Sequence, residues 1–209
     1  MHNTIRTAGT GLLVFGLGSV AAFSTSGSPG GDYASTLVTD YTASSHWPTA
    51  FVVAYVGAFA ALGLFVFGNA VRTWAGTTGE LLRGLSFAGA TASVVGWFIV
   101  GGLDVAMAEG GPQVQAGVPH PVVYTITEIG NLLAVCSPAF FVGVVAILLG
   151  AKGPLPGWLR GFSYLAGVCG VLAPFFFTYF IFVLWAIVAG VCLVATKERA
   201  SAMPQESLV

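Results

Sequence analysis

The chain has 209 residues, of which 56% are hydrophobic and 7% are charged, and its formal net charge is −1. A typical soluble domain has about 25% charged residues, so this composition argues against a water-soluble globular protein. With seven Lys and Arg residues in all, the chain lacks the basic surface that a nucleic-acid-binding protein needs. We expect the lipid bilayer to be its main partner.

Six apolar stretches follow one another along the chain, and each approaches the roughly 20 residues that a transmembrane helix needs. They lie near residues 8–24, 49–71, 84–108, 122–149, 159–176 and 178–196. Six such spans leave no room for a separate soluble domain. The sequence therefore predicts an all-α fold, in which residues 1–196 form a single bundle of six transmembrane helices and residues 197–209 form a short cytoplasmic tail.

The positive charges flank these stretches on one side of the predicted bundle. They are Arg6, Arg72, Arg83, Lys152, Arg160, Lys197 and Arg199. The other gaps, 25–48, 109–121 and the turn near 174–178, contain no Lys or Arg. Because short cytoplasmic loops retain Lys and Arg, we expect both termini in the cytoplasm and the protein in the plasma membrane. The first stretch also resembles a secretory signal, but the even number of spans requires a retained helix.

The longest gap and the shortest stretches are expected to shape the outer surface. Residues 24–48 are polar and rich in Gly and Ser, and loops of this length usually serve as lids or binding elements. The last two stretches each cover about 25 Å, less than the hydrocarbon core of about 30 Å. Their aromatic tip, residues 174–180, then leaves a dent below the outer surface, unless these side chains only form an interfacial aromatic belt.

Small residues recur at four-residue spacing on the third stretch, and a weaker version occurs on the fifth. They are Gly84, Ala88, Ala92 and Gly96, and Ser163, Ala166, Gly167 and Gly170. Such residues let two helices approach closely. We expect the third helix to be central in the bundle, and we expect small-residue faces to be the contact of any homo-oligomer or larger membrane complex.

Two carboxylates lie inside predicted spans, Asp104 on the third and Glu128 on the fourth. Each lies roughly 8–10 Å below the outer surface, counted from the helix ends. No Lys or Arg is available on that side, and ionisable groups inside a membrane usually face protein or a wet cavity. We therefore expect an outward-facing acidic pocket, although both acids can also hydrate at the nearby interface. The residues expected to complete this pocket are Trp97, Thr125 and Asn131.

Two histidines, His46 and His120, lie at the outer ends of predicted helices and are candidates to join the two acids. Two histidines and two carboxylates suit zinc or another divalent metal, so His46, His120, Asp104 and Glu128 are a candidate ligand set. No two of them have the i, i+4 spacing of a helical motif such as H-E-x-x-H. Each histidine also suits an ordinary loop or cap position, and the identity of any cofactor is left open.

The three cysteines, Cys136, Cys169 and Cys192, fall inside predicted spans and not in the outer gaps. We expect them to be reduced and packed as small apolar side chains. The sequence contains no nucleophile motif and no glycine-rich phosphate loop between a strand and a helix.

The segment from Leu155 to Arg160 reads Leu-Pro-Gly-Trp-Leu-Arg, and Ala166 to Val168 and Phe182 to Trp185 follow it. This pattern resembles the closing helix pair of several families of small six-helix bacterial membrane proteins of unknown function. The resemblance covers roughly residues 155–195. It implies six helices and carries over no catalytic or binding residue.

Three functions of different classes stay open. The sequence favours a non-enzymatic integral membrane protein that binds, or binds and translocates, a small or lipidic ligand or a cation in the acidic pocket. A membrane-embedded, metal-dependent enzyme is the second interpretation, and the metal content of the purified protein separates it from the first. The third is an accessory subunit of a larger membrane complex, which co-purification with partners in mild detergent would identify.

Overall fold

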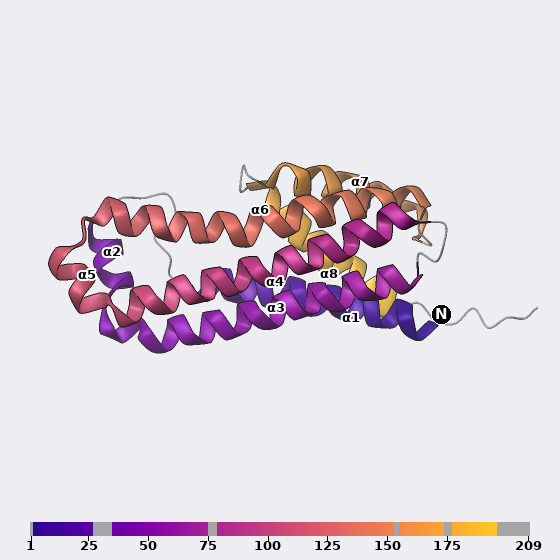
Figure 1. Cartoon of the computed structure of the whole chain (residues 1–209). Coiled ribbons are helices and arrows are strands. Elements are labelled where there is room, and N and C mark those ends of the chain that lie inside the picture. The colour runs from indigo at the N-terminus through magenta and orange to yellow at the C-terminus, as the bar shows by residue number, and fades with distance from the viewer. Residues whose placement is uncertain (1, 27–34, 75–78, 153–154, 174–176, 196–209) are drawn as a thin grey trace, which may run out of the picture.

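The computed structural model describes residues 2–26, 35–74, 79–152, 155–173 and 177–195, and the regular elements in these ranges are all helices (Figure 1). The long helices are α1 (His2–Thr25), α3 (Trp47–Trp74), α4 (Glu80–Glu109), α6 (His120–Lys152), α7 (Gly157–Val171) and α8 (Phe177–Ala195). Between them lie the short helices α2 (Ser35–Tyr41) and α5 (Gly111–Gly117) and the 3-10 helix η1 (Ser44–His46). The predicted all-α fold is confirmed for the described part of the chain.

Five of the described helices are long and apolar enough to cross a membrane, namely α1, α3, α4, α6 and α8. The remaining long helix, α7, has 15 residues, or about 22 Å, which is shorter than the hydrocarbon core of about 30 Å. The expectation that the last two helices are short is confirmed, since α8 has 19 residues and α6 has 33.

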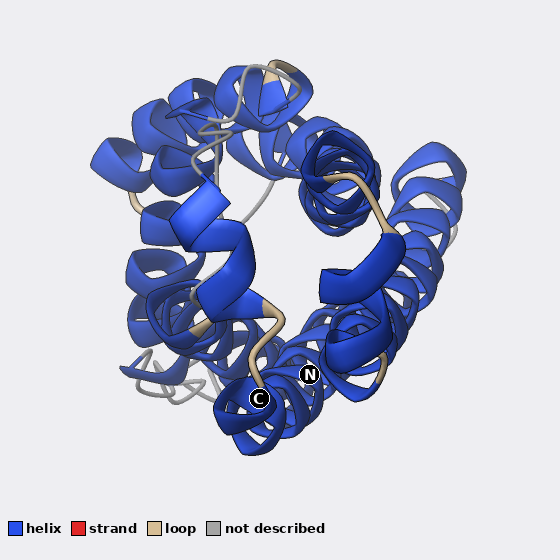
Figure 2. Cartoon of the chain, turned by 90° about the vertical axis from the view of Figure 1, so that its left-hand side faces the viewer, coloured by secondary structure: helices blue, strands red, loops and turns tan. Residues whose placement is uncertain are grey.

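The six long helices form a closed ring in the order α1, α3, α4, α6, α7, α8 and back to α1 (Figure 2). Neighbouring helices run in opposite directions: Gly9 near the start of α1 abuts Val194 near the end of α8, and Gly16 abuts Val183. The start of the first helix and the end of the last helix therefore lie at the same end of the ring. The prediction that the third long helix is central is wrong, because α4 packs lengthwise against two neighbours, as the other helices in the ring do.

Glycines allow the closest contacts between helix backbones. A Cβ atom on Gly11 would lie 2.5 Å from the Gly63 carbonyl oxygen, and one on Gly96 would lie 2.6 Å from the Leu133 carbonyl oxygen. The predicted small-residue stripe is thus used in part, but Gly84 has no neighbouring atom within 4 Å. At Gly96 the small-residue face considered for contacts between copies packs within one chain.

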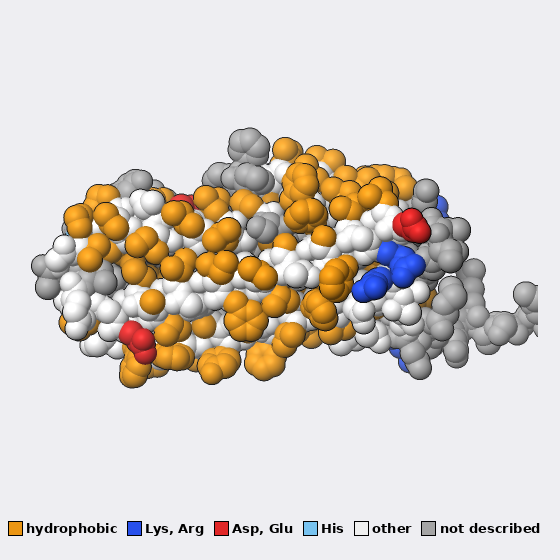
Figure 3. Space-filling view, viewed as in Figure 1, with side chains coloured by type: hydrophobic (Ala, Val, Ile, Leu, Met, Phe, Trp, Pro, Cys, Tyr) orange, Lys and Arg blue, Asp and Glu red, His pale blue; other side chains and the backbone are white. Residues whose placement is uncertain are grey.

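The two ends of the ring differ. We call the end where Arg6, Arg72, Arg83 and Arg160 lie the basic end, and the end that carries α2, η1 and α5 the cap end. The helices α3, α4 and α6 extend past α1, α7 and α8 to reach the cap end (Figure 1). On the face in Figure 3, Lys and Arg side chains gather at the basic end and hydrophobic side chains cover most of the length.

Large aromatic side chains pack together within a core that is otherwise mostly Ala, Val and Leu. Phe182 stacks on Trp185 at 5.9 Å between ring centroids and meets Phe15 edge-on at 5.9 Å. The buried Trp185 indole donates a hydrogen bond to the Ser163 hydroxyl oxygen at 2.9 Å. This bond ties α8 to α7 within the core of the ring.

The cap has a small core of its own. Val38 and Tyr41 lie one turn apart on α2 and bury their side chains against Met107 of α4 and Val123 of α6. That burial explains why part of the gap 24–48, expected to be a loop, is helical. Residues 27–34 of this gap, residues 174–176 of the predicted tip and the tail 197–209 lie outside the described residues.

Candidate functional site at the cap end

Asp104 is the half-buried carboxylate around which the cap is organised. The Tyr41 hydroxyl donates a hydrogen bond to its Oδ1 atom at 2.5 Å. Tyr41 itself is 2% exposed. A carboxylate can accept about four hydrogen bonds, so this single bond from the described residues leaves Asp104 with capacity for a further donor or a cation.

Tyr41 is held in its neutral, hydrogen-donating form. Burial, and after it the negative charge of Asp104 and the hydrogen bond to that carboxylate, raise the pKa of the Tyr41 hydroxyl well above its usual range. Ionising the phenol would place a second negative charge beside Asp104 in a poorly hydrated site. The phenol is therefore a permanent donor to Asp104 across the physiological pH range.

His46 joins this pair through a ring contact and not through a metal. Its imidazole lies against the Tyr41 ring, with 4.8 Å between the centroids. The structure thus brings two of the predicted residues, His46 and Asp104, into contact with the same tyrosine. We name Tyr41, His46 and Asp104 the cap cluster.

A cavity of about 370 Å³ opens beside the cap cluster. It is lined by Ser44, Trp47, Ala108, Glu109 and Pro112. Ala108 follows Asp104 by one helical turn on α4, and Ser44 belongs to η1 together with His46. The cavity therefore combines an exposed indole, an exposed carboxylate and the immediate neighbours of the cap cluster.

Glu128 does not join Asp104. On α6, Gly130 is the residue that abuts α4, since a Cβ atom there would lie 3.3 Å from Leu103. Two residues along a helix correspond to about 200°, so Glu128 points away from α4 and from Asp104. Thr125 is exposed and its hydroxyl donates to the Pro121 carbonyl oxygen of its own helix at 2.7 Å, so it does not reach the cap cluster either.

The remaining predicted residues are spread over different parts of the bundle. His120 is half-buried at the start of α6. Trp97 is 3% exposed and packs on Phe23 of α1, with 5.8 Å between ring centroids. The Asn131 side chain lies outside the described residues.

The predicted metal set is not assembled. Among the described residues, no three His, Cys, Asp or Glu side chains come close enough together to hold a metal ion. The physical reason is that His46 and Asp104 each contact Tyr41, and that Glu128 lies on a face of α6 turned away from α4. None of the three cysteines, which lie on α6, α7 and α8, forms a disulfide.

Sequence reasoning missed Tyr41, Trp47 and Glu109. The gap 24–48 is expected from its length to be a lid or a binding loop, although Val38 and Tyr41 at i, i+3 already suggest a short amphipathic turn. Glu109 and Trp47 are not among the residues expected to form the pocket. Their shared cavity depends on how η1 folds back onto α4, which no local pattern indicates.

No protein-family model, curated protein sequence or solved structure matches this chain. The resemblance of residues 155–195 to six-helix bacterial families therefore stays a prediction, and the site is interpreted from its own chemistry.

Proposed function

We propose that the protein is an integral membrane protein with six crossings, with its basic end in the cytoplasm and its cap end outside. Five helices are long and apolar enough to span a bilayer. The alternating directions around the ring support α7 as the sixth crossing, because α6 and α8 flank it and a short helix can be accommodated by local thinning of the bilayer. The arginines gathered at the basic end support its cytoplasmic side.

In this arrangement the cap stands at or beyond the outer membrane boundary. The helices α3, α4 and α6 have 28, 30 and 33 residues, or about 42–50 Å, against a hydrocarbon core of about 30 Å. Along α4, Asp104 lies about 30 Å from Arg83. The cap cluster is then reached from the outside and not from within the hydrocarbon.

We propose further that the cap binds a small organic cation at the cavity beside the cap cluster. The supporting observation is a half-buried Asp104 with one described hydrogen-bond donor, next to a cavity lined by Trp47 and Glu109. Carboxylates attract a cation, and an indole face binds an ammonium group through its quadrupole. A cavity of about 370 Å³ lies at the small end of the range for ligand sites. Binding is the function proposed, and translocation would need a path that no described cavity supports.

A titration of choline into the protein in nanodiscs free of choline lipids tests this function. Glu109→Gln and Trp47→Leu are each expected to weaken binding at least fivefold, about 1 kcal/mol. Glu80→Gln removes a carboxylate at the basic end and is expected to leave binding unchanged. Equal affinity in all three variants, or no binding of choline, contradicts the proposal. Binding of Zn²⁺ that Asp104→Asn abolishes would instead favour the metal-dependent alternative.

The topology has its own test. A cysteine at Gln113, on α5, is expected to react with an impermeant maleimide added to intact cells, whereas a cysteine at Glu80 is expected to react only after the membrane is opened. The reverse pattern contradicts the proposed orientation.

A further inference from the structure

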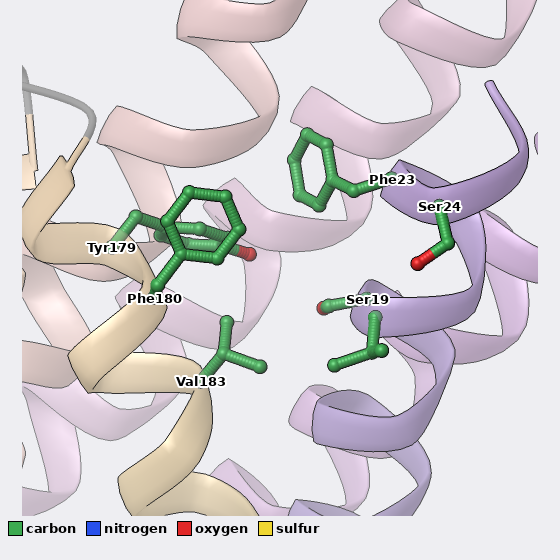
Figure 4. A pocket seen from close by; sticks show the side chains of 7 residues that line it. Ser19, Phe23, Ser24, Tyr179, Phe180 and Val183 are labelled. Atoms are coloured by element: carbon green, nitrogen blue, oxygen red, sulfur yellow. The ribbon is translucent and has the colours of Figure 1, made fainter. Parts of the chain in front are cut away.

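A second hollow lies on the side of the ring, between the end of α1 and the start of α8 (Figure 4). Its volume is about 220 Å³, and it is lined by Ser19, Val20, Phe23, Ser24, Tyr179, Phe180 and Val183. It lies next to the aromatic tip at which the sequence predicts a dent. Neither the cap cluster nor its cavity includes any of these residues.

Two fully buried hydroxyls in this hollow have no partner. Ser19 and Tyr179 are each 0% exposed, and neither the Ser19 Oγ nor the Tyr179 Oη atom has a hydrogen-bond partner among the described residues. Figure 4 shows both hydroxyls pointing into the hollow toward one another. They are polar neighbours, but their geometry is not that of a hydrogen bond. Buried polar groups in proteins are almost always paired, so these two indicate an occupant that accepts or donates hydrogen bonds.

The walls around the two hydroxyls are aromatic and uncharged. Phe23 meets the Tyr179 ring edge-on at 5.7 Å between centroids and leans on Trp97 at 5.8 Å. No Lys, Arg, Asp, Glu or His is among the lining residues. A charged occupant would find no counterion here, so the chemistry of the site suits an uncharged group.

The hollow opens toward lipid. Its residues lie inside two candidate spans, Thr4–Thr25 and Thr178–Ala195. At its mouth Val20 is 47% exposed and Phe180 is 51% exposed, so apolar side chains surround the entrance. A volume of about 220 Å³ holds one ring or one ester group and not a whole lipid, whose chain then stays in the bilayer.

We propose that this hollow binds the carbonyl group of an uncharged lipid, which accepts one hydrogen bond from Ser19 and one from Tyr179. A carbonyl oxygen has two lone pairs and can accept from both hydroxyls at once. Two sources share this chemistry: the ring of an isoprenoid quinone and the ester of an acyl lipid. The inference rests on the proposed membrane location and is independent of the cation site at the cap.

The test uses the full chain in nanodiscs of ether-linked phospholipid, which has no carbonyl group. One arm adds a photoreactive isoprenoid quinone and the other a photoreactive diacylglycerol ester, and cross-linked peptides are mapped by mass spectrometry. We expect one arm to label residues 19–24 and 179–183 and thereby to identify the source. Tyr179→Phe and Ser19→Ala are each expected to weaken that binding about five- to tenfold, the effect of losing one hydrogen bond. Ser24→Trp, at the exposed mouth, is expected to block it.

Ser93→Ala is the matched control, because Ser93 is also 0% exposed and its hydroxyl also has no described partner, but it does not line the hollow. It is expected to bind lipid like the wild type. The inference is overturned if neither lipid labels these peptides, if Tyr179→Phe binds as tightly as the wild type while melting at the same temperature, or if a high-resolution map contains only water between the hydroxyls. If the chain does not insert into nanodiscs, the membrane location fails together with the inference. If it inserts but does not bind lipid in the expected way, only the inference fails.

Discussion

The basic end and the cap end of this bundle are held together by different means. Toward the basic end all six long helices are present, and their backbones touch at glycines such as Gly11 and Gly63 around a core of aliphatic and aromatic side chains. At the cap end only α3, α4 and α6 continue, and two short helices close the space between them. The six-helix region is closed by contacts between long neighbouring helices, whereas the cap has a small apolar core around side chains such as Tyr41.

This difference separates stability from binding. In the six-helix region the buried Trp185 indole is paired with the Ser163 hydroxyl. Several other buried or half-buried polar groups are incompletely satisfied among the described residues: Asp104 at the cap, Ser19 and Tyr179 where α1 ends and α8 begins, and Ser93 within α4. Functional sites often occupy the less tightly determined parts of a fold.

The largest effect is expected from filling a backbone contact of the ring. In Gly11→Ala the new methyl group would meet the Gly63 carbonyl oxygen at 2.5 Å, and two backbones can yield only by moving apart. We expect the free energy of unfolding, measured by SDS titration in mixed micelles, to fall by about 3 kcal/mol. Gly102→Ala is the control, because nothing lies within 4 Å of that position. A gain of about 0.5–1 kcal/mol is expected there, and equal results for the two variants would contradict the contrast.

The next effect compares two buried hydroxyls. Ser163→Ala leaves the Trp185 indole N–H without its acceptor, so we expect a loss of about 2 kcal/mol in the free energy of unfolding. Tyr179→Phe removes a hydroxyl that has no described partner, and its stability in lipid-free micelles is expected to equal or exceed that of the wild type. A larger loss in the free energy of unfolding for Tyr179→Phe than for Ser163→Ala would contradict the interpretation that the Ser163 hydroxyl is paired and the Tyr179 hydroxyl is not.

A smaller and pH-dependent effect is expected at the cap. Tyr41→Phe removes the donor to Asp104 and is expected to lower the free energy of unfolding by about 1–2 kcal/mol near neutral pH. Because the pKa of Tyr41 is raised in the folded protein, its contribution is complete below the usual tyrosine value of about 10 and is lost above it. The difference between wild type and variant should therefore shrink above pH 10 by up to about 1.4 kcal/mol per pH unit. A difference that stays constant to pH 11.5 would contradict the buried phenol.

The smallest effect on global stability is expected from loosening the cap without removing a polar group. A Cβ atom on Gly111 would lie 2.0 Å from the Thr42 carbonyl oxygen, so Gly111→Ala must displace the start of α5. We expect a change below about 0.5 kcal/mol in the free energy of unfolding, because the ring is untouched. Choline affinity and hydrogen-exchange protection of α2 should nevertheless fall. A cooperative loss of the whole bundle would show that cap and ring are one unit.

The helices themselves could be predicted from the sequence with few errors, since long apolar runs in a bilayer protein can satisfy their backbone only as helices. The shortness of α7 and α8 followed from the spacing of Arg160 and Thr196. The distance of Asp104 from the end of its helix follows from the 1.5 Å rise per residue. These quantities depend on local composition and on distance along one helix.

Which helices meet, and which faces they turn to each other, was decided by tertiary packing. The ring order follows from close backbone contacts at glycines, such as Gly11 with Gly63 and Gly96 with Leu133. Glu128 and Asp104 share a similar depth, but depth does not fix rotation about a helix axis, and the contact at Gly130 turns Glu128 away. Tyr41 reaches Asp104 because α2 packs on an apolar surface of α4 and α6. That surface exists only when those two helices lie side by side. Composition and spacing therefore determined the elements of this protein, whereas side-chain complementarity between distant segments determined its sites.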